Sequence, residues 1–388
     1  MTIRHLLSDV DMGKEEALAV AEVIRSKWLS LGPRTAEFEH CFAQAFSVKH
    51  AVALSNCTAA LHLALMGLDV GPGDEVLLPS YTFVATANAV LYQGATPVFV
   101  DIMGEDDLNL AADDLESKIS TRSKAIIVVH LAGFPAGMDR IMTLAQKNGL
   151  SVVEDACHAI GATFGDPANK RFSGRKAGTV GDAGCFSFFA NKNLVTGEGG
   201  MLVTDDEALA SRVRLARSHG MTKSSWDKAH GRAYGYDVVQ LGYNYRCTEL
   251  TSALGLIQLS KLPHGNAARK RFATSYRERL TGLPGISIPF EGRLEDSAHH
   301  IFPILLEKSG ERPRFRESLD AQGIQSSVHY PPVHEFSHYL EKFPNQRHLD
   351  RTEDVAAREV TLPLHPLLTE RGVQDVCAAV EETVSAAL

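Results

Sequence analysis

Short apolar runs alternate with amphipathic stretches along the first two thirds of the chain. The runs are four to seven residues long and occupy residues 51–54, 75–78, 97–101, 124–130, 152–155 and 201–204. The run at residues 124–130 is almost wholly apolar, as is typical of strands that are covered on both faces. The intervening stretches, such as residues 59–65 and 138–147, predict helices.

Strands that alternate with helices predict an α/β fold with a mostly parallel, doubly wound central sheet and helices on both faces. Ligands bind such sheets beyond the carboxyl ends of the strands. Several residues whose side chains suit chemistry follow the predicted strands at this edge: Ser55, Phe83, His130, Asp155 and Lys192.

The last third of the chain predicts a smaller unit. A helix is expected over residues 248–262, and Pro263 with Gly265 marks its end. Strands are expected at residues 298–306 and 325–329. We therefore expect a large domain over residues 1–262, which includes an N-terminal arm, and a small C-terminal α+β domain over residues 263–388.

Composition excludes several classes of function. The 39 basic and 47 acidic residues give a net charge of −8, so the basic surface of a nucleic-acid-binding protein is absent. No apolar stretch approaches the length of a membrane helix, and the first 14 residues do not resemble a signal peptide. The six cysteines show no paired spacing, which favours a reduced, cytoplasmic location.

One lysine and one aspartate suggest the chemistry. Lys192 lies between the aromatic run of residues 186–189 and a glycine-rich turn, and Asp155 ends an apolar strand pattern upstream. An amine forms an imine when an apolar site suppresses its charge, and a carboxylate keeps a pyridine nitrogen protonated. The pair predicts pyridoxal phosphate (PLP) bound to Lys192 as a Schiff base, with Asp155 at its ring nitrogen. The alternative is a surface lysine and a helix N-cap.

Three further features could complete such a site. The segment from Ser55 to Thr58 leads from a strand into a helix, so the amides of Cys57 and Thr58 and the Thr58 hydroxyl could bind phosphate; the alternative is N-capping by Ser55 or Thr58. Phe83 could stack on the cofactor ring or belong to the core. His158 could contact the ring oxygen or be structural.

A zinc-hydrolase signature also occurs. His334, Glu335 and His338 match H-E-x-x-H, in which two histidines bind one metal when both lie on a helix. Pro331 and Pro332 lie just upstream and the segment is short. We therefore expect no metal site here.

Taken together, these stretches resemble the DegT/DnrJ/EryC1/StrS family of sugar aminotransferases, which have the aspartate-aminotransferase-like fold (fold type I) of PLP enzymes. The resemblance runs across almost the whole chain. The matching stretches are Gly32-Pro33 with Phe38-Glu39, then residues 55–65, 81–90, 154–161, 181–200 and 242–249, and His329-Tyr330-Pro331-Pro332.

The resemblance implies roles for individual residues. Lys192 is the Schiff-base lysine and Asp155 the partner of the pyridine nitrogen. The other cofactor contacts that it implies are ring stacking by Phe83, a ring-oxygen contact from His158, and phosphate binding by Cys57, Thr58 and Ser187. Asn244 matches a residue that reaches the cofactor phosphate of the neighbouring subunit, which implies a homodimer. Arg246, His329 and Tyr330 are expected near the substrate.

The function implied is transfer of an amino group from glutamate to a keto-sugar, nucleotide-linked, with pyridoxamine phosphate (PMP) in the second half-reaction. Cyclitol ketones are also accepted within the family. Lys192 favours amino transfer, because relatives that dehydrate deoxysugars have histidine at this position. The alternatives are a PLP-dependent dehydratase or lyase, a non-catalytic regulator on the same fold, and a zinc hydrolase built on His334 and His338. Loops at residues 28–32 and 221–239 are expected to set specificity.

Overall fold

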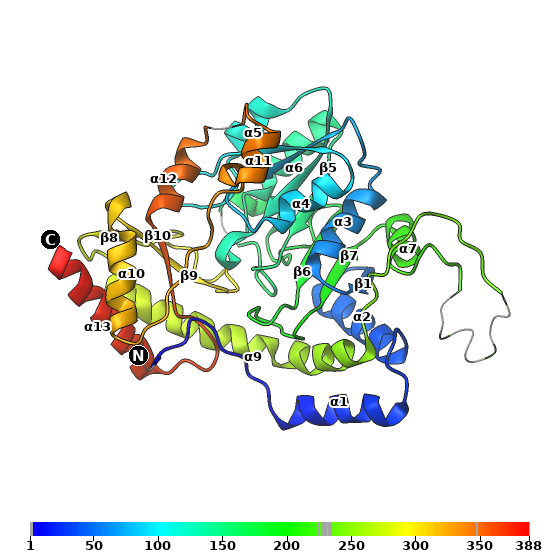
Figure 1. The fold of residues 1–388 in the computed structure, drawn as a ribbon, viewed down its shortest axis with the longest axis horizontal. Helices are drawn as coiled ribbons and strands as arrows, with labels where there is room; N and C mark the ends of the chain where they lie inside the picture. Colours follow the sequence, from blue (N-terminus) through cyan, green and yellow to red (C-terminus); the bar gives the residue numbers. More distant parts are fainter. Residues whose placement is uncertain are drawn as a thin grey trace.

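The computed structural model describes residues 3–165, 167–223, 226, 231, 235–346 and 348–387. Part of the predicted specificity loop, at residues 224–225, 227–230 and 232–234, therefore lies outside the described residues. A seven-stranded sheet forms the centre of the molecule (Figure 1). Its strands are β1 (His50–Leu54), β2 (Glu75–Pro79), β3 (Thr96–Val100), β4 (Ser123–Val129), β5 (Ser151–Asp155), β6 (Ala183–Ser187) and β7 (Gly200–Thr204).

The strand order in this sheet is β1-β7-β6-β5-β4-β2-β3. The pairs β2–β3, β2–β4, β4–β5 and β5–β6 are parallel, and β7 is antiparallel to both β6 and β1. The sheet is thus mostly parallel, as the sequence predicts. Because β1 runs in the same direction as β5 and β6, the carboxyl ends of all three strands lie at one edge.

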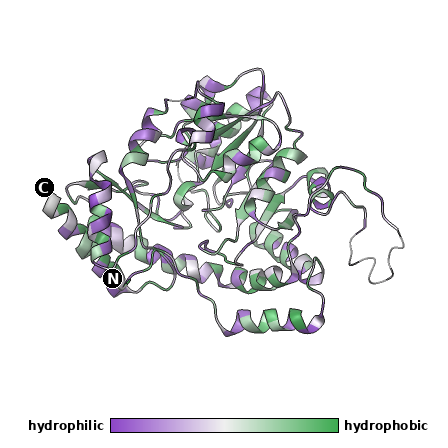
Figure 2. Ribbon diagram, in the orientation of Figure 1, coloured by the Kyte–Doolittle hydropathy of each residue, from purple (hydrophilic) through white to green (hydrophobic). Residues whose placement is uncertain are grey.

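Successive strand residues face opposite sides of the sheet, and each side has its own core. On β4, for example, Ile126 and Val128 pack in one core, whereas Ala125 and Ile127 pack in the other. The first core lies under α2 (Pro33–Phe46), α5 (Ala112–Lys118) and α6 (Met138–Asn148). The second lies under α3 (Cys57–Gly67), α4 (Ala85–Tyr92) and α7 (Glu207–Ala216). Figure 2 shows the hydrophobic residues gathered on the central strands.

A three-stranded antiparallel sheet, in the order β10-β9-β8, belongs to the C-terminal part of the chain. Its strands are β8 (Ile286–Ser287), β9 (Phe302–Leu306) and β10 (Glu359–Leu362). It packs with α10 (Arg312–Ala321), α12 (Asp350–Arg358) and α13 (Glu370–Ala387), while α11 (Ser337–Lys342) packs against the core of the large sheet (Figure 1). Residues 325–329 form no strand, contrary to the prediction.

One long helix, α9 (Glu249–Leu280), connects the two parts. The predicted end of this helix before Pro263 is wrong, because Pro263 lies inside it. Proline removes one helical hydrogen bond, but α9 packs against α1 (Lys14–Ser26), α2 and α13, and this packing supports it on both sides of the proline. The division into domains at residues 262 and 263 therefore falls within a continuous helix and stays a prediction.

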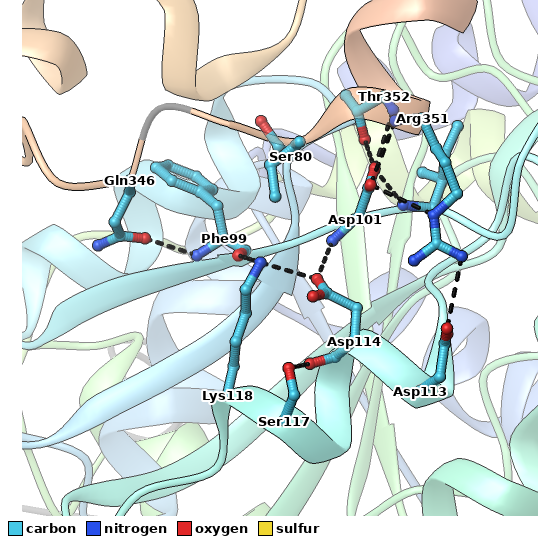
Figure 3. Close-up of polar contacts among 12 residues, drawn as sticks. Ser80, Phe99, Asp101, Asp113, Asp114, Ser117, Lys118, Gln346, Arg351 and Thr352 are labelled. Carbon is cyan, nitrogen blue, oxygen red and sulfur yellow. Dashed lines mark hydrogen bonds and ion pairs between the residues drawn. The ribbon is translucent and has the colours of Figure 1, made fainter.

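A polar network fastens the C-terminal part to the edge strand β3 (Figure 3). The Asp101 carboxylate, just after β3, accepts hydrogen bonds from the backbone N–H and the hydroxyl of Thr352, at 2.8 and 2.7 Å. It also pairs with Arg351 at 3.3 Å. Both residues lie in the first turn of α12, whose N–H groups lack partners inside the helix. A carboxylate from one sheet thus caps a helix that packs beside the other.

The two carboxylates at the end of β5 face opposite sides of the sheet. Glu154 is fully buried; it accepts hydrogen bonds from the backbone N–H groups of Gly178, Val180 and Gly181 and pairs with His130 at 2.8 Å. Asp155 faces the other side. Glu154 and His130 therefore have structural roles.

No helix among the described residues is long and apolar enough to cross a membrane.

Replacing Glu154 with alanine should lower the free energy of unfolding by about 3–5 kcal/mol, because its buried partners lose their acceptor. Urea denaturation measures this change. The control Glu116→Ala, at an exposed carboxylate with only surface ion pairs, should cost less than about 1 kcal/mol. Equal midpoints for the two variants would contradict the structural role of Glu154.

Candidate active site

A pocket of about 520 Å³ opens at the carboxyl edge of the large sheet. It receives residues from the ends of β1, β2, β4, β5 and β6 and from the C-terminal part of the chain. The predicted site residues that line it are Cys57, Thr58, Phe83, Asp155, His158, Ser187, Lys192, His329 and Tyr330. Its size and its few converging polar groups are those of a small-molecule site.

Lys192 lies in the wall of this pocket, on the turn between β6 and β7. Its backbone N–H donates to the Phe189 carbonyl at 2.9 Å, which holds the turn. The pKa of its amine is lowered by burial, against the opposing effect of Cys157, Asp155 and Cys57. A lowered pKa increases the fraction of the neutral amine, which is the form that attacks a carbonyl.

Asp155 is 5% exposed at the floor of the pocket. The Thr86 hydroxyl donates to its Oδ2 at 2.9 Å, and the Cys157 backbone N–H donates to its Oδ1 at 3.3 Å. These bonds fix the plane of the carboxylate. Thr86 was missed in the sequence, although its place on the helix that follows Phe83 could have suggested it.

The first turn of α3 forms another wall. Asn56 caps this helix by accepting from the Ala59 N–H at 2.8 Å, so the alternative of capping by Ser55 or Thr58 is wrong. Cys57 and Thr58 contribute first-turn N–H groups that a helix leaves without internal partners. Ser187, at the end of β6, lies in the same pocket. This end of the pocket therefore suits an anion.

Phe83 is 58% exposed and is not a core residue. Its ring lies 6.0 Å from that of Tyr330, and both line the pocket. An exposed aromatic ring in a pocket offers a flat surface to a planar ligand.

The contacts of His158 best test whether the cofactor fits this pocket. Its Nε2 lies 2.9 Å from the Tyr330 hydroxyl, but its Nδ1 is buried without a partner among the described residues. Burial, then the charges of Lys192 and His329, lower the pKa of His158 well below its ordinary value. Such a buried polar atom needs a partner. Lys192, Asp155, His158 and the first turn of α3 together provide a contact for each polar group of PLP. The residues of the pocket therefore fit this cofactor.

His329 and Tyr330 close the pocket from the C-terminal part. Burial, then the charge of Lys192, lowers the pKa of His329 to about 4. The His329 N–H donates to buried Glu359 at 2.8 Å, and its Nδ1 lies 2.8 Å from the Thr361 hydroxyl, which donates to the same carboxyl group. Burial raises the pKa of Glu359 to about 8. The pocket-lining residue His329 thus rests on a carboxyl group that is protonated at neutral pH.

A pH dependence of stability follows. The folded protein keeps the Glu359 proton up to about pH 8, whereas the unfolded chain releases it near the ordinary pKa of 4.5. The contribution of this group is therefore complete below pH 4.5 and is lost as the pH rises to 8. The free energy of unfolding, measured with urea at several pH values, should fall less steeply over this range in Glu359→Gln. Equal slopes would contradict the assignment.

Two predicted site residues lie elsewhere. Asn244 is exposed and pairs with Ser218 in an isolated bridge, and Arg246 pairs with Leu54 in another. Neither lines the pocket within this chain.

The zinc-like motif is divided between two short helices. His334 lies on a 3-10 turn, His338 lies on α11, and extended Phe336 separates them. Buried His334 lies 2.7 Å from the Ser80 hydroxyl and 3.2 Å from the Glu353 carboxylate. These contacts give His334 a structural role.

Among the described residues, two groups of side chains could each hold a metal ion. The ligand atoms of His334, Glu335 and Glu353 lie within 4.8 Å of one another, and those of Cys57, Asp155 and Cys157 also do. His338 belongs to neither group. The second group includes Asp155, so a metal there would compete for the carboxylate predicted to face the cofactor ring.

A family model described as the DegT/DnrJ/EryC1/StrS aminotransferase family matches residues 10–381. The chain belongs to this family. It is therefore a PLP-dependent aminotransferase, and the resemblance and the fold class expected from the sequence are confirmed.

Individual relatives match over nearly their whole lengths. The spore coat polysaccharide biosynthesis protein SpsC of Bacillus subtilis (strain 168) is 39% identical over 383 residues, which cover 97% of this chain and 96% of SpsC. The structure of Helicobacter pylori PseC, an aminotransferase involved in the biosynthesis of pseudoaminic acid, is 32% identical in sequence and has a TM-score of 0.90. The match covers 98% of this chain and 99% of PseC. The PLP form of Spr1654 from Streptococcus pneumoniae, a sugar aminotransferase by its description, is 28% identical and has a TM-score of 0.90, with both chains fully covered.

Proposed function

We propose that this aminotransferase transfers the amino group of L-glutamate to the carbonyl carbon of a keto-sugar carried on a nucleotide. The observation that carries the proposal is the pocket that joins Lys192, Asp155 and the unpartnered His158 Nδ1 in a member of this family. SpsC is named for the biosynthesis of a spore coat polysaccharide, and PseC for that of pseudoaminic acid. These products support a sugar as the amino acceptor.

Each residue then has a defined task. Lys192 binds the cofactor covalently, and its released amine moves the proton between the donor carbon and the cofactor carbon. When bound, PLP would supply the electron sink for the reacting carbon and, as PMP, would hold the amino group between the two half-reactions. Asp155 holds the proton on the ring nitrogen. The α3 amides of Cys57 and Thr58, together with Ser187, bind the phosphate.

The remaining roles concern the ring and the substrate. Phe83 stacks on the ring, and His158 donates to the ring oxygen through Nδ1 while its Nε2 accepts from Tyr330. His329 and Tyr330 contact the substrate from the C-terminal part, and Arg246 binds its anionic portion. The six free cysteines fit a cytoplasmic location.

We also propose a homodimer in which the partner subunit's Asn244 reaches the cofactor phosphate. Exposed Asn244 lies beside a strip of exposed apolar residues that a second copy of this chain would cover: Tyr236, Val238, Val239 and Leu241. Mixing inactive Lys192→Ala with Asn244→Ala should restore part of the activity, since some hybrid dimers contain one intact site.

The substrate is tested by incubating the purified enzyme with PLP, L-glutamate and three ketone classes: a nucleotide-linked keto-sugar, a free keto-sugar and a cyclitol ketone. Amine formation, measured by mass spectrometry with ¹⁵N-glutamate, should occur with the nucleotide-linked ketone. Amination of the cyclitol alone would overturn the substrate class, and elimination without transfer of ¹⁵N would favour a lyase.

A further inference from the structure

His300 makes the polar contact to the Lys192 amine. Its Nε2 lies 3.3 Å from the lysine Nζ, although the two residues are 108 positions apart. His300 is 4% exposed, and its ring lies 4.3 Å from the ring of His158. It precedes β9 and so belongs to the C-terminal part of the chain. None of the roles proposed above uses it.

A chain of hydrogen bonds fixes which nitrogen of His300 carries the proton. The Asn193 Nδ2 donates to the Ala298 carbonyl at 2.7 Å and to Asn266 at 2.9 Å. Since a carbonyl only accepts, the Asn193 amide has one possible orientation. Its oxygen therefore faces His300 Nδ1 at 3.0 Å, and that nitrogen must donate. Asn266 is oriented in turn by the Ile160 carbonyl, at 2.9 Å.

With Nδ1 donating, Nε2 of a neutral His300 can only accept. Its surroundings keep it neutral. Burial lowers the pKa of His300 well below its ordinary value, and Lys192, His158, Arg269 and His329 lower it further, because each repels a charged His300 when it is itself protonated. The lysine amine therefore faces a lone pair and meets no second positive charge.

We propose that His300 is a positioning residue for Lys192: its Nε2 accepts a hydrogen bond from the free amine and holds it where it moves the proton. This inference rests on the function proposed for Lys192. The amine is free whenever it is not bonded to the cofactor, which includes the proton-transfer step. Asn193 and Asn266 keep the acceptor facing the amine, so the network links α9, the turn that carries Lys192 and the segment before β9.

Three variants test this role. His300→Gln can keep an acceptor toward Lys192, whereas His300→Leu removes it. Asn193→Asp places a negative charge beside Nδ1, which favours a charged imidazolium that repels the lysine. The matched control is His299→Asn, since His299 is also buried but bonds the Leu294 carbonyl, and its left-handed backbone tolerates asparagine.

Two readouts separate positioning from a structural role. In the holoenzyme, stopped-flow absorbance gives the rate of the half-reaction with L-glutamate and its isotope effect with α-deuterated glutamate. In the cofactor-free protein, reductive methylation followed by peptide mass spectrometry gives the pH midpoint of Lys192 reactivity, which does not depend on turnover.

His300→Leu should slow the half-reaction about 10²-fold, enlarge the isotope effect and lower the pH midpoint of Lys192, because a neutral acceptor favours the ammonium form. His300→Gln should lie within about tenfold of the unmodified enzyme. Asn193→Asp should lose rate progressively as the pH falls. The His299→Asn control should change none of these quantities by more than about twofold.

An unchanged rate, isotope effect and midpoint in His300→Leu would overturn the proposal. Should that variant fail to fold, a rate for Asn193→Asp equal to that of the unmodified enzyme at every pH would overturn it. Failure of the function proposed for Lys192 is distinguishable, since the unmodified protein would then form no coloured complex with PLP.

Discussion

Replacing Lys192 with alanine is expected to abolish amino transfer, with a loss of about four orders of magnitude or more in kcat. The reason is that one amine both binds the cofactor and moves the proton, and no second lysine lines the pocket among the described residues. The variant should fold normally, because the wall of the pocket is held by backbone bonds of the turn. The measurement is ¹⁵N transfer from glutamate together with visible absorbance in the presence of PLP.

The matched control is His338→Ala, at the exposed end of the zinc-like motif. His338→Ala should keep full activity. A chelator should not change the activity of this variant or of the unmodified enzyme. The opposite pattern, in which Lys192→Ala stays active while His338→Ala or chelation inactivates the enzyme, would contradict the account in favour of a metal-dependent reaction.

The second large effect is expected at Asp155. Asp155→Asn keeps the size of the side chain and an oxygen for the Thr86 hydroxyl, but it removes the negative charge. Without that charge the ring nitrogen loses its proton and withdraws fewer electrons. The expected loss in kcat is roughly 10²- to 10⁴-fold, while the cofactor still attaches to Lys192. Steady-state kinetics at saturating PLP measures the loss.

Thr86→Val provides a graded comparison, because it keeps the charge and removes one hydrogen bond to it. It should lower kcat by about tenfold, which corresponds to one hydrogen bond of about 1–1.5 kcal/mol. An Asp155→Asn enzyme that is no slower than Thr86→Val would show that the carboxylate charge has no catalytic role.

The sequence predicts the large sheet well because the information is local. Strands buried on both faces are apolar along most of their length, as at residues 125–129 of β4. The residues that follow such strands gather at one edge by topology alone. For this reason the order of strands and helices along the chain is enough to predict that Asp155, Phe83 and Cys57 lie together.

Contacts between distant segments could not be predicted. His300 lies in no pattern that indicates a partner, and the place of Thr86 after Phe83 does not show which residue it contacts. Each partner is identified only when the fold brings His300 to Lys192 and Thr86 to Asp155. The structural contacts of Glu154 could not be predicted either. Glu154 and Asp155 are neighbours in one strand, but Glu154 is buried in a structural network and Asp155 lines the pocket. Helix α9 passes through Pro263 because packing outweighs the local cost of proline.

Every role proposed for the pocket depends on the capture of the PLP aldehyde by Lys192. The most direct measurement is reduction of the PLP-treated protein with borohydride, followed by peptide mass spectrometry. We expect one phosphopyridoxyl group, on the peptide that contains Lys192, and none in Lys192→Ala. A protein that remains unlabelled, or is labelled only at another lysine, would contradict it.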